Sequence, residues 1–244
     1  MKDPRSFNEK INWLKLNHID KNLTKLVDKY TVKEYVASII GEEYIIPTLA
    51  VYDSVEDIEL DKLPKQFVLK CTHDSGGIVI CKDKNKFDKE MAFKSLRHAM
   101  KRNFIALTRE YPYKNVIPRI IAEQYMEDEY GELRDYKVFC SDGKPWMLFI
   151  ASNRQTGIAN FDFYDMEFNH LPILNGHPMA PFEITKPESF DKMIELAGKL
   201  SKGFIHVRVD FYIINGHIYF GELTFFHNSG LESIKPLELS LIHI

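Results

Sequence analysis

The sequence predicts an α+β protein, because helical and extended patterns alternate without the strand–helix–strand rhythm of a parallel sheet. Two stretches are typical of β-hairpins, since apolar and aromatic runs flank the turn dipeptides Asp142-Gly143 and Asn215-Gly216. Two others, 88–102 and 189–203, repeat apolar residues at helical spacing. The 244 residues, 45% of them hydrophobic and 27% charged, are enough for one large domain or two small packed ones.

In chain order, the first expected element is a helix from Asn22 to Ile40, whose apolar residues return on one face and which Gly41 would end. Asp88 and Ser189 are the expected N-caps of the two later helices. The other expected elements are an extended segment after 47, strands at 66–71, 78–81 and 120–126, and hairpins over 136–151 and 208–226. Residues 152–188 are rich in Asn and Pro and are expected to be irregular.

Composition argues against several classes of protein. The net charge of −3 gives no bulk reason to expect nucleic acid or an anionic membrane as a partner. No apolar run approaches the ~20 residues of a membrane span, and the N-terminus lacks the apolar core of a signal peptide. The three cysteines form no CxxC pair, so they suggest neither a disulfide framework nor a zinc site. We therefore expect a cytoplasmic protein without an integral membrane segment.

Both ends of the chain look incomplete. Little precedes the first expected helix, and the last residues, LSLIHI, follow IKPLE without a stop signal or an amphipathic pattern. That hexamer resembles the translated start of a common sequencing adapter. The tail at 237–244 is therefore expected to be an artefact of read-through.

The hairpin RVDFYIINGHIYFGELTFF carries an arginine and two acids in strands that otherwise suit a buried sheet. A two-residue turn at Asn215-Gly216 would place Glu222 opposite Val209, on the other face from Asp210. A loop with an odd residue count, or a bulge, would instead give one apolar and one charged face. A type I turn with Gly216 in the left-handed region would supply such a three-residue loop.

In that second register the two faces are distinct. One holds Val207, Val209, Phe211 and Ile213 with Tyr219, Gly221, Leu223 and Phe225, and the other holds Arg208, Asp210 and Tyr212 with Phe220, Glu222 and Thr224. We predict that Asp210 and Glu222 share a face, directly or diagonally opposed, at roughly 5–8 Å between Cβ atoms.

Two carboxylates at that separation repel each other unless a cation lies between them. Oxygen ligands suit Mg²⁺, which is usually completed by water and by substrate phosphates. Arg208, on the same face, could then hold an anion near the metal. The alternative is a structural salt bridge between Arg208 and one of the acids on a solvated face.

Three further stretches combine charge with extended backbone. Lys70 ends an apolar strand before the loop His73–Gly77, whose glycines would let backbone N–H groups approach a phosphate. A plain hairpin turn is the alternative, and Asp74 should point away from any polyanion. Lys137 is a second candidate phosphate ligand or the partner of Asp135 in a strand-face ion pair. The strand that ends in Glu123–Met126 runs into an acidic loop that could meet adenine and ribose.

Taken together, these motifs resemble the ATP-grasp superfamily. The stretch VRVDFYIINGHIYFGELTF is similar to the C-terminal part of D-alanine–D-alanine ligases. More closely, FNEKINWLKL, LVDKYTVKEYV, FVLKCTHDSGGIVICKDK, PRIIAEQYMED and LRDYKVFCSDGKP resemble the TupA-like branch, over roughly Phe7 to Pro236. That branch is named for teichuronopeptide synthesis and is found among bacterial capsule and cell-wall polysaccharide genes.

The resemblance implies two α+β subdomains that clamp ATP, at 26–122 and 123–236, after a reduced N-terminal segment at 1–25. Lys70, with Lys29 as a possible second lysine, would contact the phosphates under the lid loop 73–77. Adenine would lie against 123–126, and Glu127 or Asp128 would reach the ribose. The implied cofactor-binding residues are Lys29, Lys70, His73, Ser75, Gly76, Gly77, Glu123, Gln124, Tyr125, Met126 and Glu127.

The resemblance also implies roles for the residues of the hairpin at 208–226. Asp210 and Glu222 would hold Mg²⁺, and Arg208 would face the acyl phosphate or its tetrahedral intermediate. Lys137 matches a position that is arginine in the glutamate-adding RimK-type ligases and is a second catalytic candidate. Thr224 stands where the ligases have an asparagine metal ligand, which leaves the second Mg²⁺ open. Asn228 is a possible replacement for that ligand.

The activity implied is an ATP-dependent carboxylate–amine ligase that acts through an acyl phosphate on a surface polysaccharide or its precursor. Its partners would be a carboxylate acceptor and an amine donor such as an amino acid, with possible peripheral association with polysaccharide-assembly enzymes. The acceptor site could come from 152–188 or from a partner. Two alternatives remain: a glycosyltransferase of capsule synthesis, and a non-catalytic ATP-binding module.

Overall fold

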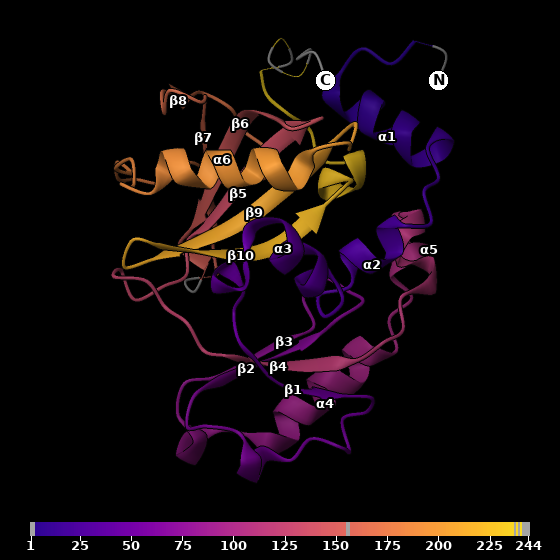
Figure 1. Cartoon of the computed structure of the whole chain (residues 1–244), viewed down its shortest axis with the longest axis vertical. Helices are drawn as coiled ribbons and strands as arrows, with labels where there is room; N and C mark the ends of the chain where they lie inside the picture. Colours follow the sequence, from indigo (N-terminus) through magenta and orange to yellow (C-terminus); the bar gives the residue numbers. More distant parts are fainter. Residues whose placement is uncertain (1–2, 155–156, 237, 239, 241–244) are drawn as a thin grey trace. The chain divides into compact units, whose positions relative to one another are not determined.

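The computed structural model describes residues 3–154, 157–236, 238 and 240 (Figure 1). The chain forms two compact units: a smaller one of residues 20–35 and 45–126, and a larger one of residues 1–19, 36–44 and 127–244. The chain passes between the two units at 19/20, 35/36, 44/45 and 126/127. The expected artefactual tail at 237–244 lies largely outside the described residues.

The smaller unit is built on a four-stranded antiparallel sheet in the order β1-β4-β2-β3. Its strands are β1 (Thr48–Tyr52), β2 (Phe67–Cys71), β3 (Ile78–Cys81) and β4 (Ile120–Gln124). Helix α4 (Lys89–Met100) buries Leu96 and Ala99 against Phe67 and Leu69, which are fully buried. As expected, Asp88 is the N-cap of this helix and accepts a hydrogen bond from the Met91 N–H.

The helix predicted from Asn22 to Ile40 is two helices, α2 (Leu23–Val27) and α3 (Val32–Ile40). The break comes at Asp28, whose carboxylate accepts the N–H groups of Tyr30 and Thr31 at 2.8 and 3.3 Å. An aspartate that binds backbone N–H groups two and three residues on favours a turn over a continuous helix. Residues 36–40 of α3 belong to the larger unit, and the smaller unit also contains α5 (Phe104–Thr108), η2 (Leu60–Lys62), η3 (Lys84–Lys86) and η4 (Tyr111–Asn115).

The larger unit contains a six-stranded antiparallel sheet in the order β10-β9-β5-β6-β7-β8. Its strands are β5 (Asp135–Ser141), β6 (Lys144–Ser152), β7 (Asn160–Tyr164), β8 (His170–Leu171), β9 (Val207–Ile214) and β10 (His217–Thr224). Helix α6 (Phe190–Ser201) lies across one face and contacts β5, β6 and β9 (Figure 1). The expectation that 152–188 is irregular was therefore wrong, since β7 and β8 fall within it.

Helix α1 (Phe7–Asn17) was not among the expected elements, although Ser6 and Glu9 form a capping box that the sequence displays. Phe7 packs edge-on against Phe139 of the sheet, with ring centroids 5.8 Å apart. The buried Lys15 donates to the carbonyl of Ser229 at 2.6 Å. Helix α1 thereby contacts the short helix η6 (His227–Gly230), and the unit also contains η1 (Glu42–Tyr44).

The β9–β10 hairpin has a two-residue turn followed by a bulge. Asn215 and Gly216 both have positive φ, at 50° and 78°, and Ile214 pairs directly with His217. The extra residue is Gly221, where the register shifts so that Glu222 pairs with Asp210. The expected three-residue loop was therefore wrong, while the bulge alternative and the shared face of Asp210 and Glu222 are confirmed.

The bulge also corrects two neighbours in the hairpin. Phe220 pairs with Phe211, and Tyr219 pairs with Tyr212, so each lies on the face opposite to the one expected. Beyond Gly221 the expected faces hold: Leu223 pairs with Val209. In the described part of the chain, no helix has both the length and the apolar character needed to span a bilayer.

Candidate functional site

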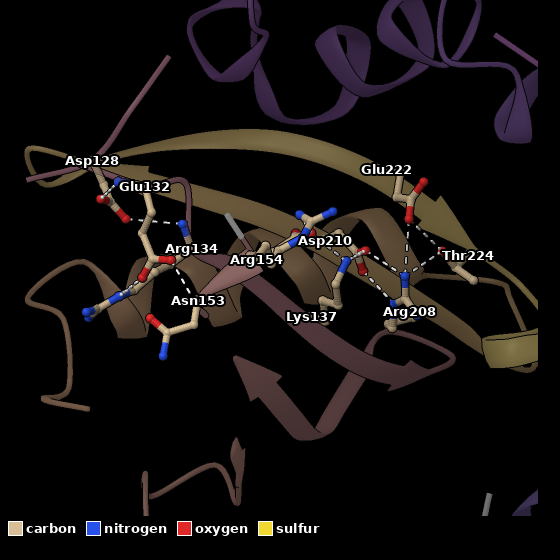
Figure 2. A network of polar contacts seen from close by, with 11 residues as sticks. Asp128, Glu132, Arg134, Lys137, Asn153, Arg154, Arg208, Asp210, Glu222 and Thr224 are labelled. Atoms are coloured by element: carbon tan, nitrogen blue, oxygen red, sulfur yellow. Dashed lines mark hydrogen bonds and ion pairs between the residues drawn. The ribbon is translucent and has the colours of Figure 1, made fainter. Parts of the chain in front are cut away.

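A cluster of charged side chains lies on one face of the larger sheet, where β5, β9 and β10 run side by side (Figure 2). Lys137 pairs with Asp210 across β5 and β9, and Asp210 pairs with Glu222 across β9 and β10. Paired residues of antiparallel strands project to the same face. The hairpin register therefore places all three side chains together.

Arg208 lies at the centre of this cluster. Its Nε and Nη2 donate to the two oxygens of Asp210, each at 2.7 Å. Nη2 also donates to Thr224 Oγ1 at 3.0 Å and to Glu222 Oε1 at 3.2 Å. The guanidinium thus fills the position between the two carboxylates at which we expected a metal ion (Figure 2).

The cluster balances its own charge. Lys137 forms ion pairs with Asp210 and with Asp135, the latter at 2.7 Å, and Arg154 pairs with Asp135 at 2.9 Å. Three carboxylates, those of Asp135, Asp210 and Glu222, face three cations, those of Lys137, Arg154 and Arg208. Asp210 is fully buried, and burial raises its pKa to about 6 although Arg208 and Lys137 act in the opposite direction.

These residues fit one magnesium ion that arrives with other ligands. Asp210, Glu222 and Thr224 direct oxygens at a single cation, Nη2 of Arg208, so the same oxygens could hold Mg²⁺ if the guanidinium withdrew. Within the described ranges, no group of three or more His, Cys, Asp or Glu side chains is placed to bind a metal. Two carboxylates and a hydroxyl would leave the remaining coordination positions to water and phosphate.

Asn228 is not directed at this cluster. Its Nδ2 donates to Asn175 Oδ1 at 3.2 Å, and its φ of 46° belongs to the turn after β10. The residue that does reach Arg208 from this turn is His227, which the sequence analysis missed. Arg154 was also missed, because it lies in a segment that was expected to be irregular.

A second polar cluster lies in the smaller unit. Lys70, on β2, contacts Glu123 Oε2 on β4 at 2.7 Å, and Lys33 contacts the other oxygen. Lys33 Nζ also donates to Thr48 Oγ1 at 2.7 Å. Burial alone would raise the pKa of Glu123, but Lys70 and Lys33 outweigh it and lower that pKa. The Glu123 carboxylate is therefore engaged by two lysines, of which Lys33, four residues beyond Lys29, was missed.

The face that carries Lys70 also presents exposed apolar surface. Ile78 pairs with Lys70, and Ile80 pairs with Val68, so both isoleucines share the face of the lysine. They are 40% and 55% exposed, although they belong to a strand. Apolar surface beside the two cations Lys70 and Lys33 suits a ligand with a flat ring and an anionic tail.

The glycine-rich loop is held from two sides. Lys29 Nζ donates to the Asp74 carbonyl at 2.5 Å, and Arg102 pairs with the Asp74 carboxylate at 3.2 Å. Asp74 and His73 are buried, so only Ser75 and Gly76 of this loop are exposed. A Cβ on Gly77 would lie 2.7 Å from Asp74 Oδ1, so this glycine is required by the inward turn of Asp74.

Gln124, the last residue of β4, is exposed, and the segment that follows has Tyr125 and Met126 half-buried and Glu127 exposed. Asp128 serves the loop itself: its carboxylate accepts the N–H group of Tyr130 at 3.0 Å. It also accepts the N–H groups of Glu132 and Arg134, each at 3.1 Å (Figure 2). Of the two acids considered for the ribose, Glu127 is therefore the one whose side chain is exposed.

The architecture is that of the ATP-grasp ligases. N5-carboxyaminoimidazole synthetase from Staphylococcus aureus, complexed with ADP, matches with a TM-score of 0.53 and 19% identity over 86% of this chain and 48% of that chain. The model of the TupA-like ATP-grasp family matches residues 9–242, and the chain belongs to this family. The α+β class, the ATP-grasp fold and the family expected from the motifs are thereby confirmed.

Two other solved structures are similar. D-alanine–D-alanine ligase from Helicobacter pylori matches with a TM-score of 0.49 and 14% identity over 90% of this chain and 59% of that chain. L-amino acid ligase from Bacillus licheniformis matches with a TM-score of 0.49 and 14% identity over 92% of this chain and 49% of that chain. The chain thus spans 48% to 59% of the length of these three structures. No curated protein matches it.

Proposed function

We propose that this protein is an ATP-dependent carboxylate–amine ligase that activates its acceptor as an acyl phosphate. The observation that carries the proposal is the cluster around Arg208, in which Asp210, Glu222 and Thr224 converge on one cation beside Lys137. A carboxylate resists attack by an amine until one of its oxygens becomes a leaving group, and phosphorylation by ATP achieves this. Such a reaction does not require a side-chain nucleophile with an adjacent base, because the substrate carboxylate itself attacks ATP.

In this proposal the smaller unit binds the nucleotide. Lys70 and Lys29 would offset phosphate charge, Ser75 and Gly76 would approach the phosphates, and adenine would lie near Ile78 and Ile80. Lys33 would act through Glu123, whose carboxylate it shares with Lys70.

The larger unit would carry the ligation. Asp210, Glu222 and Thr224 would hold Mg²⁺, which would neutralise part of the negative charge of the phosphates when bound. Arg208, released from those oxygens, would turn its N–H donors toward the acyl phosphate. Lys137 would continue to balance the negative charge of the Asp210 carboxylate. Electrostatic stabilisation by fixed cations is the main contribution that such a site can make.

We propose as acceptor a carboxylated surface saccharide or its precursor, and as donor an amino acid, in the bacterial cytoplasm. The support is membership of the TupA-like ATP-grasp family, together with the resemblance of the motifs to a branch named for teichuronopeptide synthesis. Segment 152–188 contributes to a cavity of about 630 Å³ lined by Asp162 and Tyr164. Phe163 pairs with Phe149, and Phe149 pairs with Lys137, so Phe163 lies on the face of the charged cluster. Asp162 and Tyr164 alternate with Phe163 along β7, so the cavity that they line opens on the opposite face of the sheet.

The test is ADP release from Mg·ATP in the presence of uronic acids and amino acids, with thermal shifts for ATP and UDP-sugars. We expect stabilisation by ATP but not by UDP-sugars, and loss of it in Lys70→Ala. Lys62→Ala, which removes an exposed lysine of the same unit, is the control and should behave as the wild type. A wild-type protein that is stabilised by a UDP-sugar and not by ATP would overturn the proposal.

A further inference from the structure

Arg208 is held on a second side, away from the carboxylates. Its Nη1 lies 2.7 Å from His227 Nδ1, and His227 Nε2 lies 2.8 Å from Asn175 Oδ1. Asn175 Nδ2 in turn donates to the backbone carbonyl of Ser233 at 3.1 Å. Arg208, His227 and Asn175 are all buried, so this chain of hydrogen bonds is shielded from water.

The direction of each hydrogen bond in the chain is determined by chemistry. A guanidinium has only donors, so His227 Nδ1 must be the unprotonated nitrogen that accepts from Arg208. Nε2 then carries the proton and donates to Asn175 Oδ1. The Asn175 amide is oriented consistently, because its nitrogen already donates to a carbonyl.

The His227 imidazole ring is fixed in place. It packs edge-on against Phe139, Phe149 and Phe7, with centroid distances of 5.0, 5.6 and 6.2 Å. The turn that follows it is tied to α1, because Lys15 donates to the Ser229 carbonyl. A ring packed on several sides and hydrogen-bonded at both nitrogens cannot rotate without breaking those contacts.

We infer that His227 is a positioning residue: its Nδ1, an obligate acceptor, anchors Nη1 of Arg208 beside the Asp210–Glu222 site, so that the guanidinium stays there when Nε and Nη2 turn from those oxygens to the acyl phosphate. This inference deepens the proposed function and rests on it for the role of Arg208. Within the described residues, the two ring nitrogens contact Arg208 and Asn175 and not the carboxylates of the cluster. Its effect would therefore appear in the turnover number and not in the binding of ATP.

The chain offers a matched control in His206. This histidine is also buried and packs against the same Phe7 and Phe139, at 5.5 and 6.2 Å. In the described structure neither of its ring nitrogens has a hydrogen-bond partner. Replacing either ring by Phe removes a buried imidazole, but only the change at 227 removes the acceptor for Arg208.

The kinetic test compares His227→Phe, His227→Asn and His206→Phe by ADP release from Mg·ATP. An asparagine Oδ1 can replace Nδ1 as the acceptor, whereas phenylalanine cannot. We expect His227→Phe to lower kcat by roughly 10- to 100-fold, as misplaced catalytic groups do, with KM for ATP changed less than about threefold. His227→Asn and His206→Phe should stay within about fivefold of the wild-type kcat. Equal losses in the two Phe variants, or no rescue by Asn, would overturn the inference.

A second readout separates the inference from the proposed function. In full-length protein labelled with ¹⁵N-histidine, the His227 Nδ1 signal should be that of an unprotonated nitrogen and should shift in Arg208→Ala. A protonated Nδ1, or a signal that ignores Arg208→Ala, would refute the hydrogen bond whether or not the protein turns over ATP. Failure of ATP to bind, with the expected Nδ1 signal, would refute the proposed function alone.

Discussion

Arg208 occupies the oxygens that a metal would need, which links metal binding to a single side chain. Its Nη2 contacts Asp210, Glu222 and Thr224 at 2.7 to 3.2 Å, and the cluster has no net formal charge. A divalent cation that bound alone would add two charges to a balanced, buried site. Metal should therefore bind together with the phosphates that neutralise it, and only weakly by itself.

Arg208→Gln should raise the affinity of the nucleotide-free protein for Mn²⁺, used as a spectroscopic substitute for Mg²⁺, by about tenfold or more. Removal of the guanidinium takes a donor from four oxygens, two of Asp210 and one each of Glu222 and Thr224, and leaves the cluster one charge negative. Titration followed by electron paramagnetic resonance measures the free ion. Arg154→Gln removes the same charge and serves as the control, because the ion pair that Arg154 makes within the described residues is with Asp135 and not with Asp210 or Glu222. Equal gains in both variants would show that charge, and not occupancy, decides the affinity.

Glu123 is the counter-ion of two lysines, and its loss should be costly. Glu123→Gln would leave Lys33 and Lys70 without a carboxylate, and breaking a buried pair in this way typically destabilises a protein by about 3–5 kcal/mol. Urea unfolding measures the change. Glu59→Gln removes the partner of Lys62 in an exposed pair and should change stability by less than about 1 kcal/mol. A Glu123→Gln protein as stable as the Glu59→Gln control would contradict this role.

Much of the candidate site follows from residue types in the sequence, but the partners of those residues do not. Alternation along the hairpin placed Arg208, Asp210 and Glu222 on one face, and the register bears this out. Lys33 and His227 were missed because their roles depend on contacts with Glu123 and Arg208 that only the fold creates. Asn228 was a plausible ligand by spacing, yet its positive φ and its contact with Asn175 direct it elsewhere.

At the scale of the element, the hairpin shows what a sequence pattern leaves open. The alternation requires one extra residue in the hairpin but does not say where it is inserted. Both Gly216 and Gly221 could provide it, and the pattern favoured the turn, whereas the structure uses the bulge at Gly221. The helical pattern of 22–40 likewise continues across Asp28, whose side chain ends α2 by binding local N–H groups.

Gly221→Ala should destabilise the protein by about 1–3 kcal/mol, the usual cost of overpacking a well-filled position. A Cβ at this position would lie 3.1 Å from the Asp210 carbonyl oxygen and 3.3 Å from the Tyr212 ring. Thermal unfolding gives the loss of stability. The comparison is Gly203→Ala, where nothing lies within 4 Å of the added Cβ and only the positive φ of 84° opposes the change. Normal stability of Gly221→Ala would mean that the bulge relaxes freely.

At the scale of the whole molecule, each unit has one polar cluster on its sheet and one apolar face covered by a helix. In the smaller unit α4 covers the Leu69 face, opposite Lys70. In the larger unit Cys140, on the face opposite Lys137, approaches the Ala197 carbonyl of α6. The apolar periodicity of the sequence predicted α4 and α6, because each buries one apolar face against a sheet. Helix α1 was missed because its buried face contacts the distant turn at 227–230.

Stability should fall in mild acid because of buried neutral histidines. Burial, with Arg208 nearby, lowers the pKa of His206 from 6.5 to about 3. Between those values the unfolded chain binds a proton that the folded chain does not, so the free energy of unfolding falls as pH drops, by about 1.4 kcal/mol per unit per histidine. His206→Phe should make this dependence shallower between pH 6.5 and 5 in chemical unfolding. An unchanged slope would show that His206 titrates when folded.

The bulge at Gly221 makes the far end of the hairpin a permissive site for engineering. Asn215 and Gly216 are exposed, and between them and Gly221 the strands pair in unbroken register. Residues added in pairs, one on each strand, would extend the ribbon while Asp210 and Glu222 stayed opposite each other. A peptide tag or a fluorophore could thus be attached there as a reporter, whereas a single inserted residue between 217 and 220 would turn the tip over relative to the charged cluster.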